Sequence, residues 1–142
     1  MIHIQQIDSE ALLSMAFQIR HDVFVIGQNV PHEEEYDAHE KSSTHYLAFW
    51  DTTPAGTARW RFTEKGIKLE RFAVLEKFRE RGVGAALLLA VQSDVEKHRK
   101  TAQVYLHAQT HAIKFYERFG FIKTGSLFYE CDIPHYKMIW QD

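Results

Sequence analysis

Three strand-like segments separated by short turns fill the middle of the chain, and they restrict its fold more than any other feature. Residues 44–50, 57–63 and 67–74 are rich in aromatic and β-branched side chains. Residues 51–56 and 64–66 join these segments and carry the glycine, proline and acidic residues that favour turns. Strand, turn, strand, turn, strand is the pattern of an antiparallel meander. The sequence therefore predicts a sheet that contains three antiparallel neighbours in chain order.

Strands and helices alternate on both sides of this meander. The clearest helix is expected from Val83 to Val95, where apolar residues recur at helical spacing. The other predicted segments are, in chain order, a strand at 2–7, a helix capped by Asp8 or Ser9 that runs to 23, a long loop or a loop with a short helix at 28–43, a strand at 103–107, a short helix at 110–119, and strands at 121–130 and 136–140. This order predicts an α/β domain of the layered α+β type, with a mixed, mainly antiparallel central sheet flanked by helices. A chain of 142 residues with no repeat or linker is expected to form one domain over residues 1–142.

Composition argues against several classes of protein. The formal net charge is −2 and no block of lysine and arginine occurs, so we expect no nucleic-acid partner. The longest apolar stretch, at 85–91, is too short to span a bilayer. Met1 to Gln6 shows no basic start followed by an apolar run, so no signal peptide is expected. The one cysteine, Cys131, cannot form an intramolecular disulfide, which suits the cytoplasm, and we interpret it as a packing residue of a late strand.

A glycine-containing loop between a strand and the long helix is the first candidate binding site. Gly82 and Gly84 carry no side chain, so a ligand can approach the backbone closely. Amide groups at the start of a helix and the positive end of its dipole suit a pyrophosphate. The dinucleotide fingerprint fails because Leu87 stands where its third glycine belongs, and the Gly-Lys-Ser/Thr of a P-loop is missing. The alternative is that the two glycines only permit a tight turn.

Two motifs in this chain resemble those of the GCN5-related N-acetyltransferase (GNAT) family. The first, Arg79-x-x-Gly82-x-Gly84, resembles the family's Arg/Gln-x-x-Gly-x-Gly/Ala signature. The second runs from Gln109 to Phe121 and resembles Asn-x-x-Ala-x-x-x-Tyr-x-x-x-Gly-Phe, with Gln109 in place of Asn. The resemblance covers essentially the whole chain. The stretches at 24–31, 106–109 and 133–135 are similar to a subgroup of small bacterial proteins, those like ElaA and YjcF.

The resemblance implies a donor site and a reaction. The expected activity is transfer of an acetyl group from acetyl-CoA to a primary amine, by direct attack in a ternary complex. Pantetheine would lie beside the fourth strand like an extra strand, with the Val74 N–H as oxyanion donor. The implied contacts to coenzyme A are Phe72, Ala73, Val74, Arg79, Arg81, Gly82, Val83, Gly84, Ala85, Gln109 and Tyr116.

Tyr116 is the residue that the resemblance implies as general acid. A phenol has a pKa of about 10 and a thiol one of about 8.5, so a neutral tyrosine can protonate a departing thiolate over a short contact. The alternative is that Tyr116 only packs with Phe115 and Phe119.

An acidic segment before the second strand offers candidates for the general base. Its carboxylates are Glu33, Glu34, Glu35, Asp37 and Glu40, and we take Glu34 as the base. Such a group could also attract a cationic amine. The segment could equally be a solvated acidic loop. His45 and His135 are alternative bases, since imidazoles titrate near neutral pH.

No metal is expected in this chain. His107 and His111 are four residues apart, but they lie on either side of a predicted strand-to-helix junction. Partners should be acetyl-CoA and an amine acceptor, more readily a small molecule than a protein, and a homodimer is left open. Two other interpretations remain: a coenzyme A-binding sensor without catalysis, and a purely structural interaction domain.

Overall fold

A computed structural model describes residues 1–141, and its core is one seven-stranded sheet. The strands are β1 (Ile2–Gln6), β2 (Thr44–Trp50), β3 (Thr53–Thr63), β4 (Gly66–Val74), β5 (Val104–Gln109), β6 (Phe121–Glu130) and β7 (Ile133–Trp140). Their order in the sheet is β1-β2-β3-β4-β5-β7-β6. Only β4 and β5 pair in parallel, so the predicted mixed, mainly antiparallel sheet is confirmed.

Helices cover both faces of the sheet. They are α1 (Glu10–Arg20), which continues into the π-helix η1 (His21–Ile26), then α2 (His32–Glu35), α3 (Val83–Val95) and α4 (Ile113–Glu117), with short 3-10 turns at Glu76–Phe78, Glu96–His98 and Thr110–Ala112. Ser9 caps α1, because its hydroxyl accepts a hydrogen bond from the Leu12 N–H at 3.2 Å. The predicted capping is confirmed.

Two apolar cores hold these layers together. On one face, Leu87, Leu88 and Val91 of α3 are fully buried against β2, β3 and β4. On the other face, Ala16 and Ile19 of α1 pack on Leu47 of β2 and Ala73 of β4. Strand residues that alternate between the two faces therefore supply both cores.

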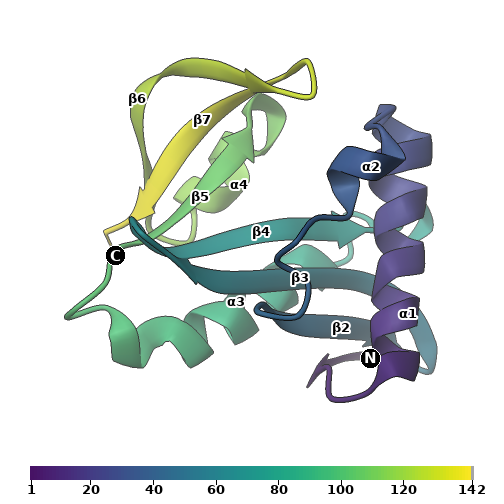
Figure 1. Ribbon diagram of the computed structural model, residues 1–142. Helices are drawn as coiled ribbons and strands as arrows, with labels where there is room; N and C mark the ends of the chain where they lie inside the picture. The colour runs from purple at the N-terminus through teal and green to yellow at the C-terminus, as the bar shows by residue number, and fades with distance from the viewer. Residues whose placement is uncertain (142) are drawn as a thin grey trace.

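The sheet opens into a cleft between β4 and β5. These strands pair only where Ile67–Leu69 lies beside Val104–Leu106, although both strands continue further. Figure 1 shows β5, β6 and β7 leaning away from β2, β3 and β4 beyond this point. The second half of β4 therefore keeps a backbone edge that no neighbouring strand covers on the β5 side.

A β-bulge lies in β4 beside this cleft. Thr57 pairs with Ala73, but Arg59 pairs with Glu70, so β4 has one residue more than β3 between the two pairs. Arg71 within the bulge has a φ of 59°. A bulge bends the strand and changes where the following side chains and amides point. It therefore sets the direction of residues 72–74 at the cleft.

Three strand ends differ from the expectation by two or more residues. β3 begins at Thr53 rather than at 57, because Pro54 pairs with Phe49 next to a bulge, where its missing N–H is tolerated. β5 continues to Gln109 and β7 begins at Ile133, because they pair with each other over this length. Cys131 was expected inside a strand, but it is exposed in the turn between β6 and β7 with a φ of 50°. Its interpretation as a packing residue is wrong.

Within residues 1–141, no helix is long and apolar enough to cross a membrane.

Candidate active site

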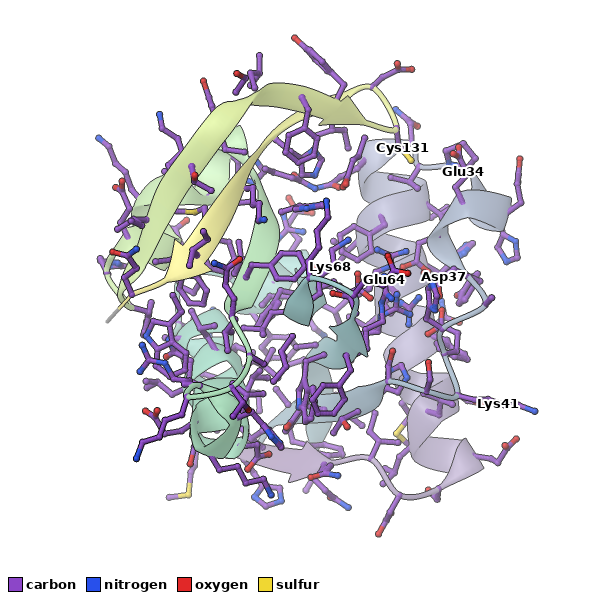
Figure 2. All side chains as sticks on the ribbon, turned by 60° about the vertical axis from the view of Figure 1, so that its left-hand side comes forward. Glu34, Asp37, Lys41, Glu64, Lys68 and Cys131 are labelled. Carbon is purple, nitrogen blue, oxygen red and sulfur yellow. The ribbon has the colours of Figure 1, made fainter. Side chains whose placement is uncertain are left out.

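A cavity of about 700 Å³ fills the cleft. Its walls come from β4, β5, η1 and the residues after it, the acidic segment, α4 with the turn before it, and the β6–β7 turn with the start of β7. Figure 2 shows Glu34 of α2 close to Cys131 of the β6–β7 turn, at one end of the cleft. Partial burial and the Glu34 carboxylate raise the pKa of the Cys131 thiol, which agrees with this proximity.

The structure divides the expected coenzyme A contacts into two groups. Phe72, Ala73, Val74, Arg79, Gln109 and Tyr116 line the cavity. Arg81, Gly82, Val83, Gly84 and Ala85 are not part of its wall and form the start of α3 and the loop before it. Val74 connects the groups, because its side chain would lie 3.8 Å from a Cβ placed on Gly84.

The start of α3 presents free backbone donors. Gly82 caps the helix in the left-handed conformation, with a φ of 88°, and no side chain caps it. The Ala86 N–H donates to the Gly82 carbonyl at 3.0 Å, which is the first backbone hydrogen bond of the helix. Within residues 1–141, the N–H groups of residues 83–85 have no backbone acceptor outside the helix. These donors can bind an anion.

Gly84 is not required by the fold. A Cβ at this position would meet Phe115 Cζ at 3.6 Å and Val74 Cγ2 at 3.8 Å, which are ordinary van der Waals contacts. Its φ does not fall in the left-handed region either, in contrast to Gly82. The packing around Gly84 therefore accepts a Cβ, and the absence of a side chain leaves the neighbouring amides at the start of α3 uncovered.

Three polar side chains of the expected donor site have partners within the protein. Arg79 Nε donates to the Val74 carbonyl at 3.0 Å, so this side chain braces the end of β4. The Arg81 guanidinium lies over the Trp50 ring at 5.5 Å. The Gln109 amide donates to Gln28 Oε1 at 2.9 Å and accepts from Gln28 Nε2 at 3.2 Å. This pair joins the segment after η1 to the end of β5 across the cleft.

Tyr116 both packs and faces the cavity. Its ring makes edge-to-face contacts with Phe72 at 6.2 Å and Phe115 at 5.2 Å between centroids. Within residues 1–141 its hydroxyl makes no hydrogen bond, and the residue lines the cavity. Burial raises the pKa of Tyr116, which keeps the hydroxyl protonated near neutral pH. Both interpretations of Tyr116 made from the sequence are therefore compatible with its position.

The acidic segment is mostly neither solvated nor free to act as a base. Arg20 of α1 is 1% exposed and donates to Glu35 Oε1 at 2.8 Å and to both oxygens of Glu40 at 2.9 and 2.7 Å. Arg59 of β3 is 0% exposed and donates to Glu40 at 2.8 Å and Asp37 at 2.8 Å. These carboxylates therefore neutralise two buried arginines.

Glu70 of β4 extends this buried network toward the cavity. Its carboxylate accepts from Arg59 Nε at 2.8 Å and Arg61 Nε at 2.7 Å, and Lys68 Nζ lies 3.3 Å away. The bulge residue Arg71 contacts Asp37 at 3.1 Å. Sequence reasoning missed Arg20 and Arg59, because an arginine inside a helical or strand pattern usually lies on the surface.

We expect this network to make the fold sensitive to acid. Burial alone would raise the pKa values of its carboxyl groups, but Arg59 and Arg61 lower the pKa of Glu70 to about 2, and Arg59 holds the pKa of Asp37 well below its usual range. The unfolded chain therefore binds more protons than the folded chain, so this stabilisation is complete above about pH 4.5 and is lost as the pH falls toward about 2. Urea unfolding at a series of pH values measures the loss. The free energy of unfolding should depend less steeply on pH in Glu70→Gln than in the wild type. An equal dependence in both proteins would show that Glu70 does not cause the acid sensitivity.

The other candidate bases lie in different places. Glu34 is exposed and lines the cavity. His45 is buried outside the cavity wall and its Nε2 lies 2.8 Å from the Glu40 carbonyl oxygen. Burial lowers the pKa of His45. His135 lines the cavity, with Nδ1 at 2.7 Å from the Ile133 carbonyl oxygen.

A histidine–carboxylate pair was not foreseen from the sequence. His107 Nδ1 of β5 lies 2.8 Å from Oε2 of Glu130, the last residue of β6, and both residues line the cavity. They are 23 residues apart, and only the order β5-β7-β6 brings them together. Within residues 1–141, no group of three or more His, Cys, Asp or Glu side chains is placed to hold a metal ion.

Known proteins are similar to this chain in sequence and in fold. Residues 8–141 match the sequence model of the acetyltransferase (GNAT) domain. The uncharacterized N-acetyltransferase YjcF of Bacillus subtilis is 36% identical over 132 residues, which cover 92% of this chain and 94% of that protein.

Solved structures agree with the sequence matches. The crystal structure of Escherichia coli ElaA superposes with a TM-score of 0.88 at 29% identity, over 99% of this chain and 100% of ElaA. An acyl-CoA N-acyltransferase from Pseudomonas aeruginosa has a TM-score of 0.83 at 25% identity, over 98% of this chain and 97% of that one. The chain therefore belongs to the acetyltransferase (GNAT) family of acyl-CoA-dependent acyltransferases, within its ElaA- and YjcF-like group.

Proposed function

We propose that the protein transfers an acetyl group from acetyl-CoA to a primary amine, by direct attack of the amine in a ternary complex. The observation that carries this proposal is the continuity of the cleft. An uncovered edge of β4 leads from the cavity at Phe72 to Val74, and Val74 adjoins the free amides at the start of α3. A thioester on an extended arm with a pyrophosphate at its far end matches this arrangement.

The donor is proposed to bind along this path. Pantetheine would pair with the backbone of Phe72, Ala73 and Val74, which no strand covers on the β5 side. Amides from Gly82 to Ala85 would bind the pyrophosphate, with charge added by Arg79 and Arg81. Gln109 would support the arm from the opposite wall, where its pairing with Gln28 holds the amide in place.

The acyl transfer itself is proposed to need an oxyanion donor and an acid. The Val74 N–H would donate to the thioester oxygen as negative charge develops there. The Tyr116 hydroxyl would protonate the departing thiolate, since it is protonated and without another hydrogen bond among the described residues. Glu34, exposed at the cavity wall, would attract the cationic amine and take up its proton, directly or through water.

Coenzyme A release with a panel of primary amines tests the proposed function. The enzyme should release coenzyme A from acetyl-CoA faster with at least one amine than without any. Tight acetyl-CoA binding without stimulation by any amine would favour the alternative of a sensor that does not catalyse transfer. No binding of any acyl-CoA would contradict the donor site.

Gly84→Val is expected to block acetyl-CoA binding. A Cβ at this position makes only ordinary contacts, and the further methyl groups of valine would crowd the backbone amides that the pyrophosphate must approach. Thermal unfolding of the variant checks that the fold is kept. Calorimetric titration with acetyl-CoA should show at least about a tenfold loss of affinity, or about 1.4 kcal/mol. Gly84→Ala is the matched control, and its affinity for acetyl-CoA should fall less. Unchanged affinity in a folded Gly84→Val protein would show that the pyrophosphate binds elsewhere.

A further inference from the structure

The cavity wall contains a second candidate proton acceptor besides Glu34, and a hydrogen bond to a carboxylate orients it. His107 projects from β5 with Nδ1 2.8 Å from Glu130 Oε2. Its Nε2 makes no hydrogen bond to any of residues 1–141. His107 and Glu130 both form part of the cavity wall, opposite Phe72 and Glu70 of β4.

The tautomer of His107 follows from its partner. Burial would raise the pKa of Glu130, but the hydrogen bond from His107 and the charge of nearby cations lower it. The carboxyl group is therefore ionised near neutral pH and can only accept hydrogen bonds. Nδ1 of His107 must then carry the hydrogen, which leaves the lone pair of the neutral ring on Nε2. A carboxylate that orients an imidazole in this way also stabilises the imidazolium once it forms.

Neighbouring side chains hold the pair in place. The Phe128 ring packs edge-to-face on His107 with centroids 5.0 Å apart, and it stacks on His135 at 5.8 Å. His135 Nε2 lies 3.6 Å from the other oxygen of Glu130. His107 is itself fixed by the pairing of β5 with Lys137 of β7. The side chain is about one quarter exposed and forms part of the cavity wall, so it is not sealed inside the protein.

We infer that His107 is the catalytic base at the reaction centre and that Glu130 is its positioning residue. This inference rests on the proposed function. An aliphatic ammonium ion must lose two protons to become an amide nitrogen. Glu34, which is exposed beside the β6–β7 turn in Figure 2, is placed to take the first proton from the arriving ammonium and pass it to solvent. His107 lies on the cavity wall and takes the second.

Acyl transfer then follows a sequence of bond changes. The amine lone pair forms a bond to the thioester carbon, and the carbonyl π electrons move to oxygen. The nitrogen, now positively charged, gives a proton to the lone pair of His107 Nε2. The oxygen electrons re-form the carbonyl group, the carbon–sulfur bond breaks, and its electron pair leaves on sulfur, which takes the Tyr116 proton. The imidazolium then returns one proton to the tyrosinate through water.

Acceptors of different basicity test the role of His107. Benzylamine is protonated in neutral buffer, whereas aniline is neutral there and forms an intermediate acidic enough to lose its proton to water. In His107→Gln, kcat with benzylamine should fall about tenfold to a hundredfold, whereas kcat with aniline should change less than about threefold. If benzylamine is not used, the best protonated amine of the panel replaces it. An equal fall of kcat with both amines would indicate that His107 has only a structural role, and it would overturn the inference.

Two further variants and a spectroscopic measurement complete the test. Long-range proton–nitrogen NMR spectra of the labelled wild type, assigned with His107→Gln, should show His107 with hydrogen on Nδ1. Glu130→Gln should change this tautomer balance and reduce kcat with benzylamine. His3→Gln, at an exposed position of β1, should change neither. Hydrogen on Nε2 in the wild type would overturn the inference. Full activity of His107→Gln would refute the role of His107 as base and leave the proposed function in place. A wild type that is inactive with every amine would refute both the proposed function and the role of His107.

Discussion

Tyr116→Phe should lower the turnover number about a hundredfold, the lower end of what general acid catalysis contributes. The change removes one oxygen and keeps the ring, whose contacts with Phe72 and Phe115 involve only its aromatic face and edge. Within residues 1–141 the hydroxyl has no hydrogen bond to lose, so the fold should change little. The thiolate would leave without its proton donor, and the rate of acyl transfer would fall.

The measurement separates catalysis from binding. Turnover with an amine that the wild type uses and acetyl-CoA affinity are determined for both proteins. We expect turnover to fall while affinity stays within about a factor of two, since about 0.4 kcal/mol or less should be lost from donor binding. Equal turnover would remove Tyr116 from the mechanism and leave it as a packing residue. A parallel loss of affinity and thermal stability would instead mean that the hydroxyl supports the local fold.

Arg59→Met should destabilise the protein by about 3–5 kcal/mol, because it leaves buried carboxylates without their counter-ion. Arg59 is 0% exposed and binds Asp37, Glu40 and Glu70, which belong to two segments of the chain. Methionine fills much of the same volume, so the loss should come from charge rather than from a cavity. For a domain of this size the melting temperature should fall by roughly 10 °C or more.

Arg61→Met is the matched control for this prediction. Arg61 lies on the same strand and face, but it contacts only Glu70, which keeps Arg59 and Lys68 as partners. Among residues 1–141, Glu70 is its one hydrogen-bonded partner, so Arg61→Met should lower the free energy of unfolding clearly less than Arg59→Met. Adding Glu70→Gln to Arg59→Met should recover part of the stability, because one unpaired charge is removed. Equal effects of Arg59→Met and Arg61→Met in urea unfolding would show that burial of the network contributes little.

Local features of the sequence were sufficient to predict the fold class and the start of the long helix. Gly82 needs a left-handed backbone with a φ of 88°, and the apolar spacing after it marks the start of α3. These signals depend on neighbours within a few residues. The ends of β3, β5 and β7 were missed, because strand length depends on the partner strand: Pro54 is part of β3 only because Phe49 pairs with it.

The acid–base groups of the site show what sequence reasoning could not supply. The sequence of the acidic segment is compatible with solvated, catalytic or buried carboxylates. Arg20 and Arg59, which lie far from it in sequence, decide that Glu35, Asp37 and Glu40 are counter-ions, whereas Glu34 stays exposed.

The sequence by itself determined the fold class, the glycine loop at the start of α3 and the place of Tyr116 in the short helix α4, since each depends on periodicity or on backbone conformation over a few residues. The tertiary structure alone decided which charges are paired and which side chains share the cavity. His107 meets Glu130 because β7 lies between β5 and β6, with its own register to each of them. Contacts of this kind depend on strand order and register, which no local pattern in the sequence records.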